Sequence, residues 1–379
     1  MANQKERSAA PVDLDQKVDF LSHPGNHPHG PAEVETIETH MAWVFLAGTE
    51  VIKLKKPVRY DYLDFATLDA RWEDCLREVR LNRRLTSGVY RGIRALRRSP
   101  DGDLALSGAL IDPPAAAGYE EEEGAGGGAP PYGERSAPGD AEADREVAEW
   151  LVQMRRLPRN RMLDVLIETG TVPLEEVRGV VEKLVPFYRK ATPVRLTPPE
   201  YRDRFQREIR ECRREIEKSE VETSGGSLER VEGGLLAFLA ERSEALDARA
   251  LKSRIVEGHG DLRPEHICLT SEPAVIDCLE FNFDLRVVDP VDDLAFLTVE
   301  CVRLGDPGLG DLVLSWYRSA SGDDPPEELI AFYRGYRALL RAKISAWHLL
   351  DEGIEDQREK WIGRTGKYLE LAGEFLSGV

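Results

Sequence analysis

Alternating apolar and polar positions dominate the first part of the chain and predict an antiparallel sheet. Two β-rich runs in VETIETHMAWVFLAGTEVIKLKKPV are joined by AGTE, a pattern typical of a hairpin. In the second run Lys53 and Lys55 alternate with apolar residues, so both lysines lie on one face of the strand. That face needs either solvent or an anion. A strand at the edge of the sheet, with solvated lysines, is the alternative.

A helix follows in LDFATLDARWEDCLREVRLNRRL, where apolar residues recur at spacings of three and four. These positions form one buried stripe, and Glu78 borders the stripe, so its carboxylate can reach inward. A pairing along the helix is the alternative for Glu78. Two short strands in IRALRR and LALSGALI come next, and REVAEWLVQMRRLP predicts the strand that returns to them.

Helical periodicity takes over in the second part of the chain. Residues 160–255 predict three helices, and the end of the chain predicts others, including EELIAFYRGYRALLRAKISAWHLL. Arg334, Arg337 and Arg341 line one side of that helix. Arginine stems that cover a helix groove, or pairing with local Glu, are favoured over an anionic substrate. A sheet-rich first part and a helical second part indicate the α+β class.

Composition divides the chain further. Residues 1–33 contain many Pro, Gly and His residues and predict a flexible arm, and residues 113–144 predict a flexible inserted loop of Pro, Gly, Ala and acids. The boundary between the two parts falls after the returning strand. We therefore expect an N-terminal part at 34–157 and a C-terminal part at 158–379.

The 379 residues carry a formal charge of −18, which argues against a general nucleic-acid or anionic-membrane binder because phosphate groups require clustered Lys and Arg. Five cysteines without a CxxC spacing indicate reduced thiols. The sequence contains no apolar run of the roughly 20 residues that a membrane span needs. A cytoplasmic protein without nucleic-acid or membrane partners is the expectation.

Between the helices stands a polar loop in VEGHGDLRPEHICL, followed after a short turn by AVIDCLEFN. Each segment contains an apolar strand, and the turn EPA folds the second strand back along the first. Asp261 in the loop and Asp277 just past the second strand are 16 residues apart. Such a frame aims both carboxylates at one point.

HGDLRPEH resembles the catalytic loop HGDxxxxN of the aminoglycoside phosphotransferase and choline kinase group, and VID resembles the metal-binding strand end of the same group. ETH…WVFLAG…VIKLKKPV resembles a branch of uncharacterised bacterial phosphotransferase-like proteins. The resemblance implies a protein-kinase-like bilobal fold, with an antiparallel-sheet N-lobe and a mainly helical C-lobe. It also implies ATP as the phosphoryl donor, Mg²⁺ or Mn²⁺ as the metal, and a small hydroxyl-bearing molecule as the acceptor.

In the C-lobe the resemblance implies that Asp261 accepts or orients the proton of the acceptor hydroxyl and that Asp277 holds the metal. His259 is expected to brace the loop by hydrogen bonds, and Arg263 completes the predicted catalytic set. Asp293, in a helix further along the chain, matches a residue that anchors this loop.

In the N-lobe the resemblance implies that Lys53 clamps the nucleotide phosphates, with Lys55 as the reserve, and that Glu78 pairs with Lys53. Met154 and Arg156, at the expected hinge, are predicted to offer backbone groups to the adenine. The sequence has no GxGxxG before the hairpin, which disfavours a protein kinase.

One departure from the pattern is His266, which stands where the group has a metal-binding Asn. Magnesium prefers oxygen, whereas imidazole suits softer ions such as manganese or zinc. Three outcomes stay open: His266 is a tolerated ligand, it contacts substrate or phosphate while another oxygen binds the metal, or catalysis is lost. Glu280 and Asn282 offer a replacement oxygen.

The leading prediction is an ATP-dependent kinase of a sugar, amino sugar or aminoglycoside-like acceptor, acting as a monomer or homodimer. A nucleotide-binding pseudokinase or regulatory module is the alternative, and His266 is its support in the sequence.

Overall fold

A computed structural model of the chain describes residues 12–60, 63–113, 145–219, 221, 226–351 and 353–378. The chain divides into two compact units. Unit 1 comprises Met1–Leu157 and Glu280–Asn282, and unit 2 comprises Pro158–Leu279 and Phe283–Val379. The loop predicted at 113–144 lies, from residue 114 on, outside the described residues.

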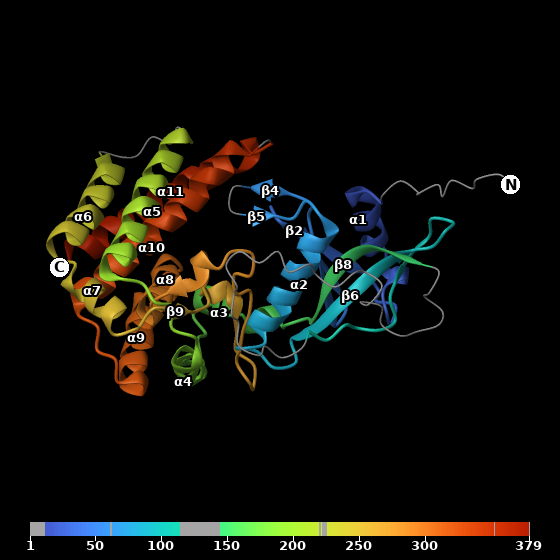
Figure 1. The fold of residues 1–379 in the computed structure, drawn as a ribbon, viewed down its shortest axis with the longest axis horizontal. Coiled ribbons are helices and arrows are strands. Elements are labelled where there is room, and N and C mark those ends of the chain that lie inside the picture. Colours follow the sequence, from blue (N-terminus) through green and yellow to red (C-terminus); the bar gives the residue numbers. More distant parts are fainter. Residues whose placement is uncertain are drawn as a thin grey trace. The chain divides into compact units, whose positions relative to one another are not determined.

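Unit 1 is built on a six-stranded antiparallel sheet in the order β1-β2-β3-β8-β6-β7 (Figure 1). The strands are β1 Val34–Glu38, β2 Ala42–Ala47, β3 Glu50–Lys55, β6 Tyr90–Arg98, β7 Leu104–Leu106 and β8 Glu146–Arg155. A second, two-stranded sheet consists of β4 Arg59–Tyr60 and β5 Leu63–Asp64. The predicted hairpin of β2 and β3 and the returning strand β8 are confirmed. Strand β3 lies between β2 and β8, so it is not an edge strand.

Helix α2, Leu68–Asn82, covers part of this sheet. It begins after Thr67, whose hydroxyl accepts a hydrogen bond from the amide of Ala70 at 3.1 Å and so caps the helix. Of its predicted apolar stripe, Trp72, Cys75 and Val79 are buried, and the centroid of the Trp72 ring lies 4.5 Å from that of Trp150 on β8. The stripe therefore fixes the rotation of α2 about its axis, which decides where its acidic residues point.

The N-terminal segment differs from the predicted arm. Helix α1, Leu14–Ser22, is capped by Asp13 and packs Leu21 into the core that contains Phe45 and Leu54. The expectation of a flexible arm over 1–33 is therefore wrong for this helix. The Pro, Gly and His residues after position 22 dominated the composition, although the apolar residues at 14, 18 and 21 have helical spacing.

Unit 2 is mainly helical, as predicted. Its helices are α3 Leu163–Glu168, α4 Leu174–Lys190, α5 Pro198–Lys218, α6 Ser227–Glu241, α7 Glu244–Leu251, α8 Pro290–Arg303, α9 Pro307–Ser321, α10 Glu327–Trp347 and α11 Arg358–Ser377. Two-stranded sheets are formed by β9 Val256–Glu257 with β12 Val287–Val288 and by β10 Ile267–Cys268 with β11 Ala274–Val275. Helix α8 is buried over most of its length and packs against α9 and α10, so it is the central helix of the unit (Figure 1).

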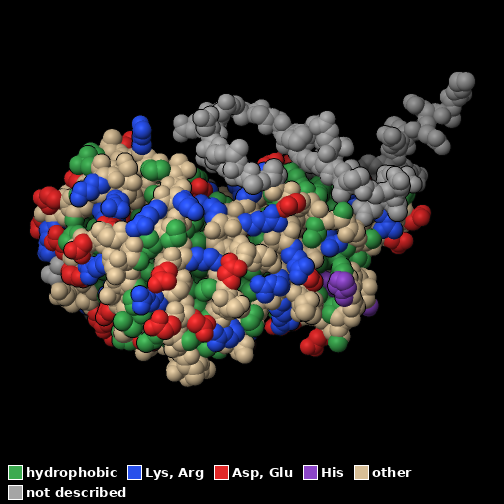
Figure 2. Space-filling model, turned by 90° about the horizontal axis from the view of Figure 1, so that it is seen from below, with side chains coloured by type: hydrophobic (Ala, Val, Ile, Leu, Met, Phe, Trp, Pro, Cys, Tyr) green, Lys and Arg blue, Asp and Glu red, His purple; other side chains and the backbone are tan. Residues whose placement is uncertain are grey.

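The arginine stripe on α10 takes part in helix packing. Arg337 pairs with Asp292 at 2.7 Å, Arg341 pairs with Glu300 at 2.8 Å, and Arg334 also contacts an acid. Pairing with acids is the favoured interpretation of the stripe, and these contacts confirm it. On the face shown in Figure 2, acidic and basic side chains are interspersed. Among the described residues no helix is long and apolar enough to cross a bilayer.

Candidate active site

The loop 259–266 and the turn at Asp277 lie at the same end of a short hairpin in unit 2. Strand β10 pairs with β11 in antiparallel register, with Ile267 opposite Val275. The amide of Ile276 donates to the carbonyl of His266 at 2.9 Å, which extends the pairing to the loop. The structure therefore brings Asp261 and Asp277 close to one residue, His266, as the folded-back frame predicts.

Asp293, in the first turn of α8, holds the start of this loop. Its Oδ2 accepts hydrogen bonds from the amide of His259 at 2.8 Å and from the hydroxyl of Tyr188 at 3.0 Å, and its Oδ1 accepts from the amide of Gly260 at 3.0 Å. A Cβ at Gly258 would lie 2.9 Å from Asp293 Oδ2, and Gly260 has a φ of +83°. Gly258 thus leaves room for the carboxylate, and Gly260 provides the left-handed backbone that the loop needs.

His259 is fully buried and braces the loop. Its Nε2 lies 3.0 Å from the carbonyl of Ile276, and its Nδ1 accepts from the amide of Asp261 at 3.2 Å. These partners require the tautomer with the proton on Nε2. Burial lowers the pKa of His259, against the opposing charge of Asp293, so the ring is neutral at pH 7.

Asp261 carries the carboxylate predicted to act as the base, and its side chain is 19% exposed. Its Oδ1 lies 2.9 Å from Nε of Arg263. Burial raises the pKa of Asp261, but the positive charges of Arg263 and Arg341 outweigh burial, so the net pKa is lowered. Asp261 is therefore ionised at neutral pH and can accept a hydrogen bond or a proton.

His266 connects the two acids. Its Nδ1 lies 2.9 Å from the carbonyl oxygen of Asp261, and its Nε2 lies 2.9 Å from Nη2 of Arg263 and 3.3 Å from Oδ2 of Asp277. A carbonyl only accepts and a guanidinium only donates, so the proton of the neutral ring lies on Nδ1 and Nε2 is the acceptor. The structure thus gives both ring nitrogens protein partners.

Asp277 has a φ of +61°, in the left-handed region, and its side chain is 46% exposed. Aspartate is one of the few residues besides glycine that adopt this conformation readily. The turn places the carboxylate just past β11, within reach of solvent. A hard divalent cation prefers such oxygen ligands, so Asp277 fits the predicted metal ligand.

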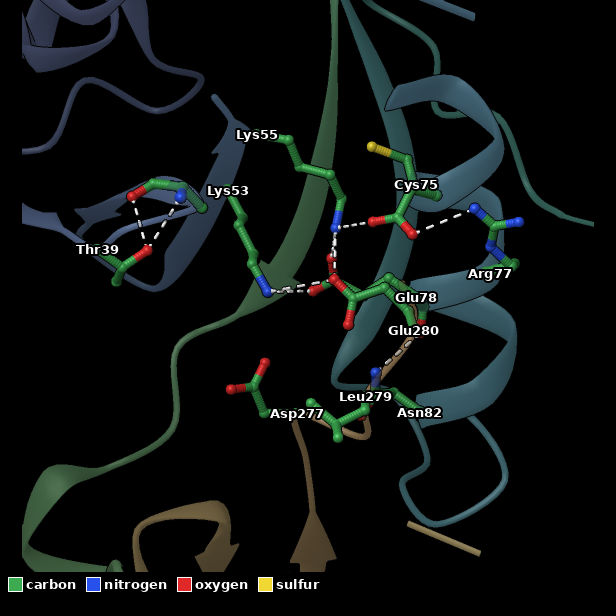
Figure 3. Close-up of polar contacts among 12 residues, drawn as sticks. Thr39, Lys53, Lys55, Cys75, Arg77, Glu78, Asn82, Asp277, Leu279 and Glu280 are labelled. Carbon is green, nitrogen blue, oxygen red and sulfur yellow. Dashed lines mark hydrogen bonds and ion pairs between the residues drawn. The ribbon is translucent and has the colours of Figure 1, made fainter. Parts of the chain in front are cut away.

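In unit 1 the ion pair predicted between Lys53 and Glu78 is present, with Nζ and Oε1 2.9 Å apart (Figure 3). The other carboxylate oxygen of Glu78 lies 2.6 Å from Nζ of Lys55, so one carboxylate bridges both lysines. Lys53 is 16% exposed and Lys55 is 1% exposed. Lys53 is thus the lysine that retains access to solvent.

Lys55 is the centre of a buried cluster. Besides Glu78, its Nζ contacts Glu280 at 2.6 Å (Figure 3) and Asp74, also at 2.6 Å. Burial, together with Glu280 and against the charge of Lys55, raises the pKa of Asp74 to about 6. Arg77 also pairs with Asp74, at 3.4 Å, so two lysines and one arginine balance the three acids when every group is ionised.

Sequence reasoning missed two members of this cluster. Asp74 precedes Glu78 by four residues and so lies on the same face of α2, a signal that was available. Glu280 was considered as a replacement metal ligand, but the structure places its carboxylate against Lys55. No sequence signal links Lys55 to a residue 225 positions away.

The predicted hinge residues lie at the end of β8. The amide of Arg155 donates to the carbonyl of Val89 and the amide of Arg156 donates to the carbonyl of Thr49, both at 2.8 Å. The amide of Arg156 is therefore already used within unit 1. The assignment of Met154 and Arg156 to adenine binding stays a prediction.

Comparisons with known proteins agree at the level of the fold. No family model matches the chain. Uncharacterised proteins of Mycobacterium tuberculosis strain H37Rv and of Mycobacterium bovis are each 32% identical over 318 residues, which is 82% of this chain and 54% of theirs. The chain thus spans about half the length of the curated relatives it matches.

A crystal structure of choline kinase from Cryptosporidium parvum superimposes with a TM-score of 0.50 and 11% identity, covering 96% of this chain and 97% of that one. This chain shares its fold. A choline/ethanolamine kinase family protein from Mesorhizobium loti gives a TM-score of 0.47 and 14% identity over 96% of this chain and 99% of that one. The predicted protein-kinase-like fold, with its antiparallel sheet and helical part, is confirmed.

Proposed function

We propose that this protein is an ATP-dependent kinase that transfers the γ-phosphoryl group to a hydroxyl of a small acceptor of the sugar, amino sugar or aminoglycoside class. The observation that carries the proposal is the loop around Asp261. Asp293 holds the loop backbone from one side and Arg263 keeps the Asp261 carboxylate ionised from the other. A carboxylate held in this way suits general-base catalysis on an alcohol.

In the proposed reaction Asp261 orients the acceptor hydroxyl and takes its proton. The bond from the acceptor oxygen to the γ-phosphorus forms, the bond from that phosphorus to the β–γ bridging oxygen breaks, and ADP leaves. Lys53, whose amine is held by Glu78, is the proposed ligand of the nucleotide phosphates. Its partial exposure allows it to contact an anion, whereas Lys55 is enclosed by three carboxylates.

Asp277 would hold the divalent metal, which supplies positive charge for the phosphate oxygens when bound. Its exposed carboxylate would supply the oxygen ligand, and Nε2 of His266 lies 3.3 Å from that carboxylate. The oxygen ligand agrees with magnesium, and manganese accepts either ligand type.

The experiment that tests the proposal is an acceptor panel. Sugars, amino sugars, amino alcohols and aminoglycosides are each incubated with ATP and either Mg²⁺ or Mn²⁺, and ADP release is measured. We expect acceptor-dependent release by the parent protein and its loss in Asp261→Asn. If the variant releases ADP as fast as the parent, the proposed base is wrong.

A nucleotide-binding pseudokinase is the second candidate, and the occupied ring nitrogens of His266 favour it. Nucleotide binding without turnover of any acceptor in the panel would support it. Turnover that requires both Asp261 and a divalent metal would exclude it.

A further inference from the structure

His266 stands at the position of the catalytic loop where protein kinases have an Asn that binds a second magnesium ion; the first is held by the strand-end Asp. The side chain of His266 is 9% exposed. Its Nδ1 is bound to the Asp261 carbonyl, which fixes the ring orientation and leaves Nε2 as the single lone pair available for any ligand.

That lone pair already has a partner. Nη2 of Arg263 lies 2.9 Å from Nε2, and a guanidinium remains charged throughout the pH range of proteins. A metal ion on Nε2 would have to replace this donor and would then stand beside a positive group.

The distance between Nε2 of His266 and Oδ2 of Asp277 does not decide whether both atoms could bind one metal ion. Nε2 and Oδ2 of Asp277 are 3.3 Å apart, and two ligands at right angles, each about 2.1 Å from a magnesium ion, are about 3 Å apart. Distance therefore allows a shared ion, whereas the chemistry of the donors opposes it. Imidazole is a poor magnesium ligand, and its lone pair points at a permanent cation.

Arg263 is well placed to do what a second ion does. Its Nη2 is held by His266 at 2.9 Å, its Nε forms an ion pair with Asp261 at 2.9 Å without a hydrogen bond, and Nη1 carries two further N–H donors. Guanidinium groups bind phosphate oxygens through such paired donors.

We propose that the protein works with a single metal ion on Asp277, and that Arg263, positioned by His266, supplies on the phosphoryl group the charge of the missing second ion. This inference rests on the proposed function. His266 is then a positioning residue that contacts neither the metal nor the substrate.

Manganese provides a spectroscopic test that needs no acceptor. The protein is titrated with Mn²⁺ in the presence of a non-hydrolysable ATP analogue, and free Mn²⁺ is followed by electron paramagnetic resonance. We expect one bound ion in the parent protein and two in His266→Asn, which restores an oxygen ligand. Electron spin echo envelope modulation of the bound ion should show no coupling to a ¹⁴N nucleus of histidine.

His23→Asn serves as the matched control because His23 is exposed and lies in unit 1; it should bind one ion, as the parent does. A ¹⁴N coupling in the parent that disappears in His266→Asn, or two ions in the parent, would overturn the single-metal inference and leave the kinase proposal standing. No nucleotide-dependent Mn²⁺ binding at all would overturn both.

Affinity for the analogue gives an independent measure of Arg263. In the parent background Arg263→Met should weaken binding about tenfold, which corresponds to about 1.4 kcal/mol. In the His266→Asn background, where the second ion takes over the charge, the same substitution should weaken binding by less than about threefold. If Arg263→Met weakens binding equally in the two backgrounds, Arg263 does not take the place of a second metal ion.

Discussion

Two clusters of charged residues, one in each unit, differ in what surrounds their carboxylates. Around Lys55 in unit 1, three acids lie within 2.6 Å of one amine that is 1% exposed. Around His266 in unit 2, the side chain of Asp277 is 46% exposed and that of Asp261 is 19% exposed. Both clusters contain the residue types of an active site, but Asp277 of the second is far more exposed than any of the three acids around Lys55.

The difference shows that burial distinguishes charged groups that stabilise the fold from charged groups that can bind a ligand or react. A buried charge that loses its partner is strongly destabilising because the remaining charge is left without solvent. A partly exposed charge can exchange its partner for water or a substrate at a small cost. Lys53 lies between the two cases, because it shares Glu78 with Lys55 and yet is 16% exposed.

The largest effect is expected in unit 2, from Asp261→Asn. The amide cannot take the proton of the acceptor, so phosphoryl transfer should fall by roughly 10²- to 10⁴-fold. The neighbouring Arg263 retains an oxygen partner, so the thermal midpoint should change little. Steady-state ADP release and a melting curve measure the two quantities. A protein that unfolds instead would show that Asp261 is a structural charge.

The next effect belongs to the buried cluster. Lys55→Met leaves the acids Asp74, Glu78 and Glu280 without their central amine and should lower the free energy of unfolding by roughly 3–5 kcal/mol. Chemical denaturation measures this change. As the matched surface control, Arg178→Ala removes an exposed pair with Glu182 and should cost less than about 0.5 kcal/mol.

A pH dependence sharpens the same comparison. The pKa of Asp74 is about 6 in the folded protein, above its ordinary value of about 3.9, so the fold favours the protonated acid. This contribution to stability is complete below the ordinary pKa and is lost as the pH rises through 6. The free energy of unfolding should therefore fall by roughly 1–3 kcal/mol between pH 4 and 7 because of this group.

The control for that dependence is Asp74→Asn. The amide does not titrate, so the fall in unfolding free energy between pH 4 and 7 should be smaller than in the parent. An unchanged pH profile would show that Asp74 is not the group responsible.

The smallest effect is expected from Lys53→Met. Replacement of the partly exposed Lys53 should lower the free energy of unfolding by less than about 1 kcal/mol, because Lys55 keeps the Glu78 carboxylate in place. Nucleotide affinity should weaken about tenfold, which corresponds to about 1.4 kcal/mol. Isothermal titration with an ATP analogue measures it. If Lys53→Met and Lys55→Met destabilise equally, the distinction between the two lysines fails.

The parts that the sequence predicted are those set by local patterns. The hairpin of β2 and β3, helix α2 and the loop carrying Asp261 each follow from spacings within about 20 residues. The anchoring contact of Asp293 followed from a family resemblance, and the structure shows both of its hydrogen bonds to the loop backbone.

The parts that it did not predict depend on contacts between distant segments. Alternation along β3 puts Lys53 and Lys55 on one face, but only α2 and the segment after Asp277 decide which of them is enclosed. For the same reason, the sequence offered Glu280 as a replacement metal ligand, whereas its carboxylate pairs with Lys55. Whether His266 faces a metal or Arg263 depends on side-chain geometry within the loop, which residue order does not contain.

Helix α1 has a practical consequence for expression. A boundary drawn from composition would start the protein at residue 34 and discard the helix as a tail. Leu21 packs in one core cluster with Phe45, Ile52 and Leu54. Removal of residues 1–33 would therefore expose hydrophobic side chains of the sheet to solvent. A chain shortened in this way should aggregate. Its low yield would result from the loss of α1 and would say nothing about the catalytic residues.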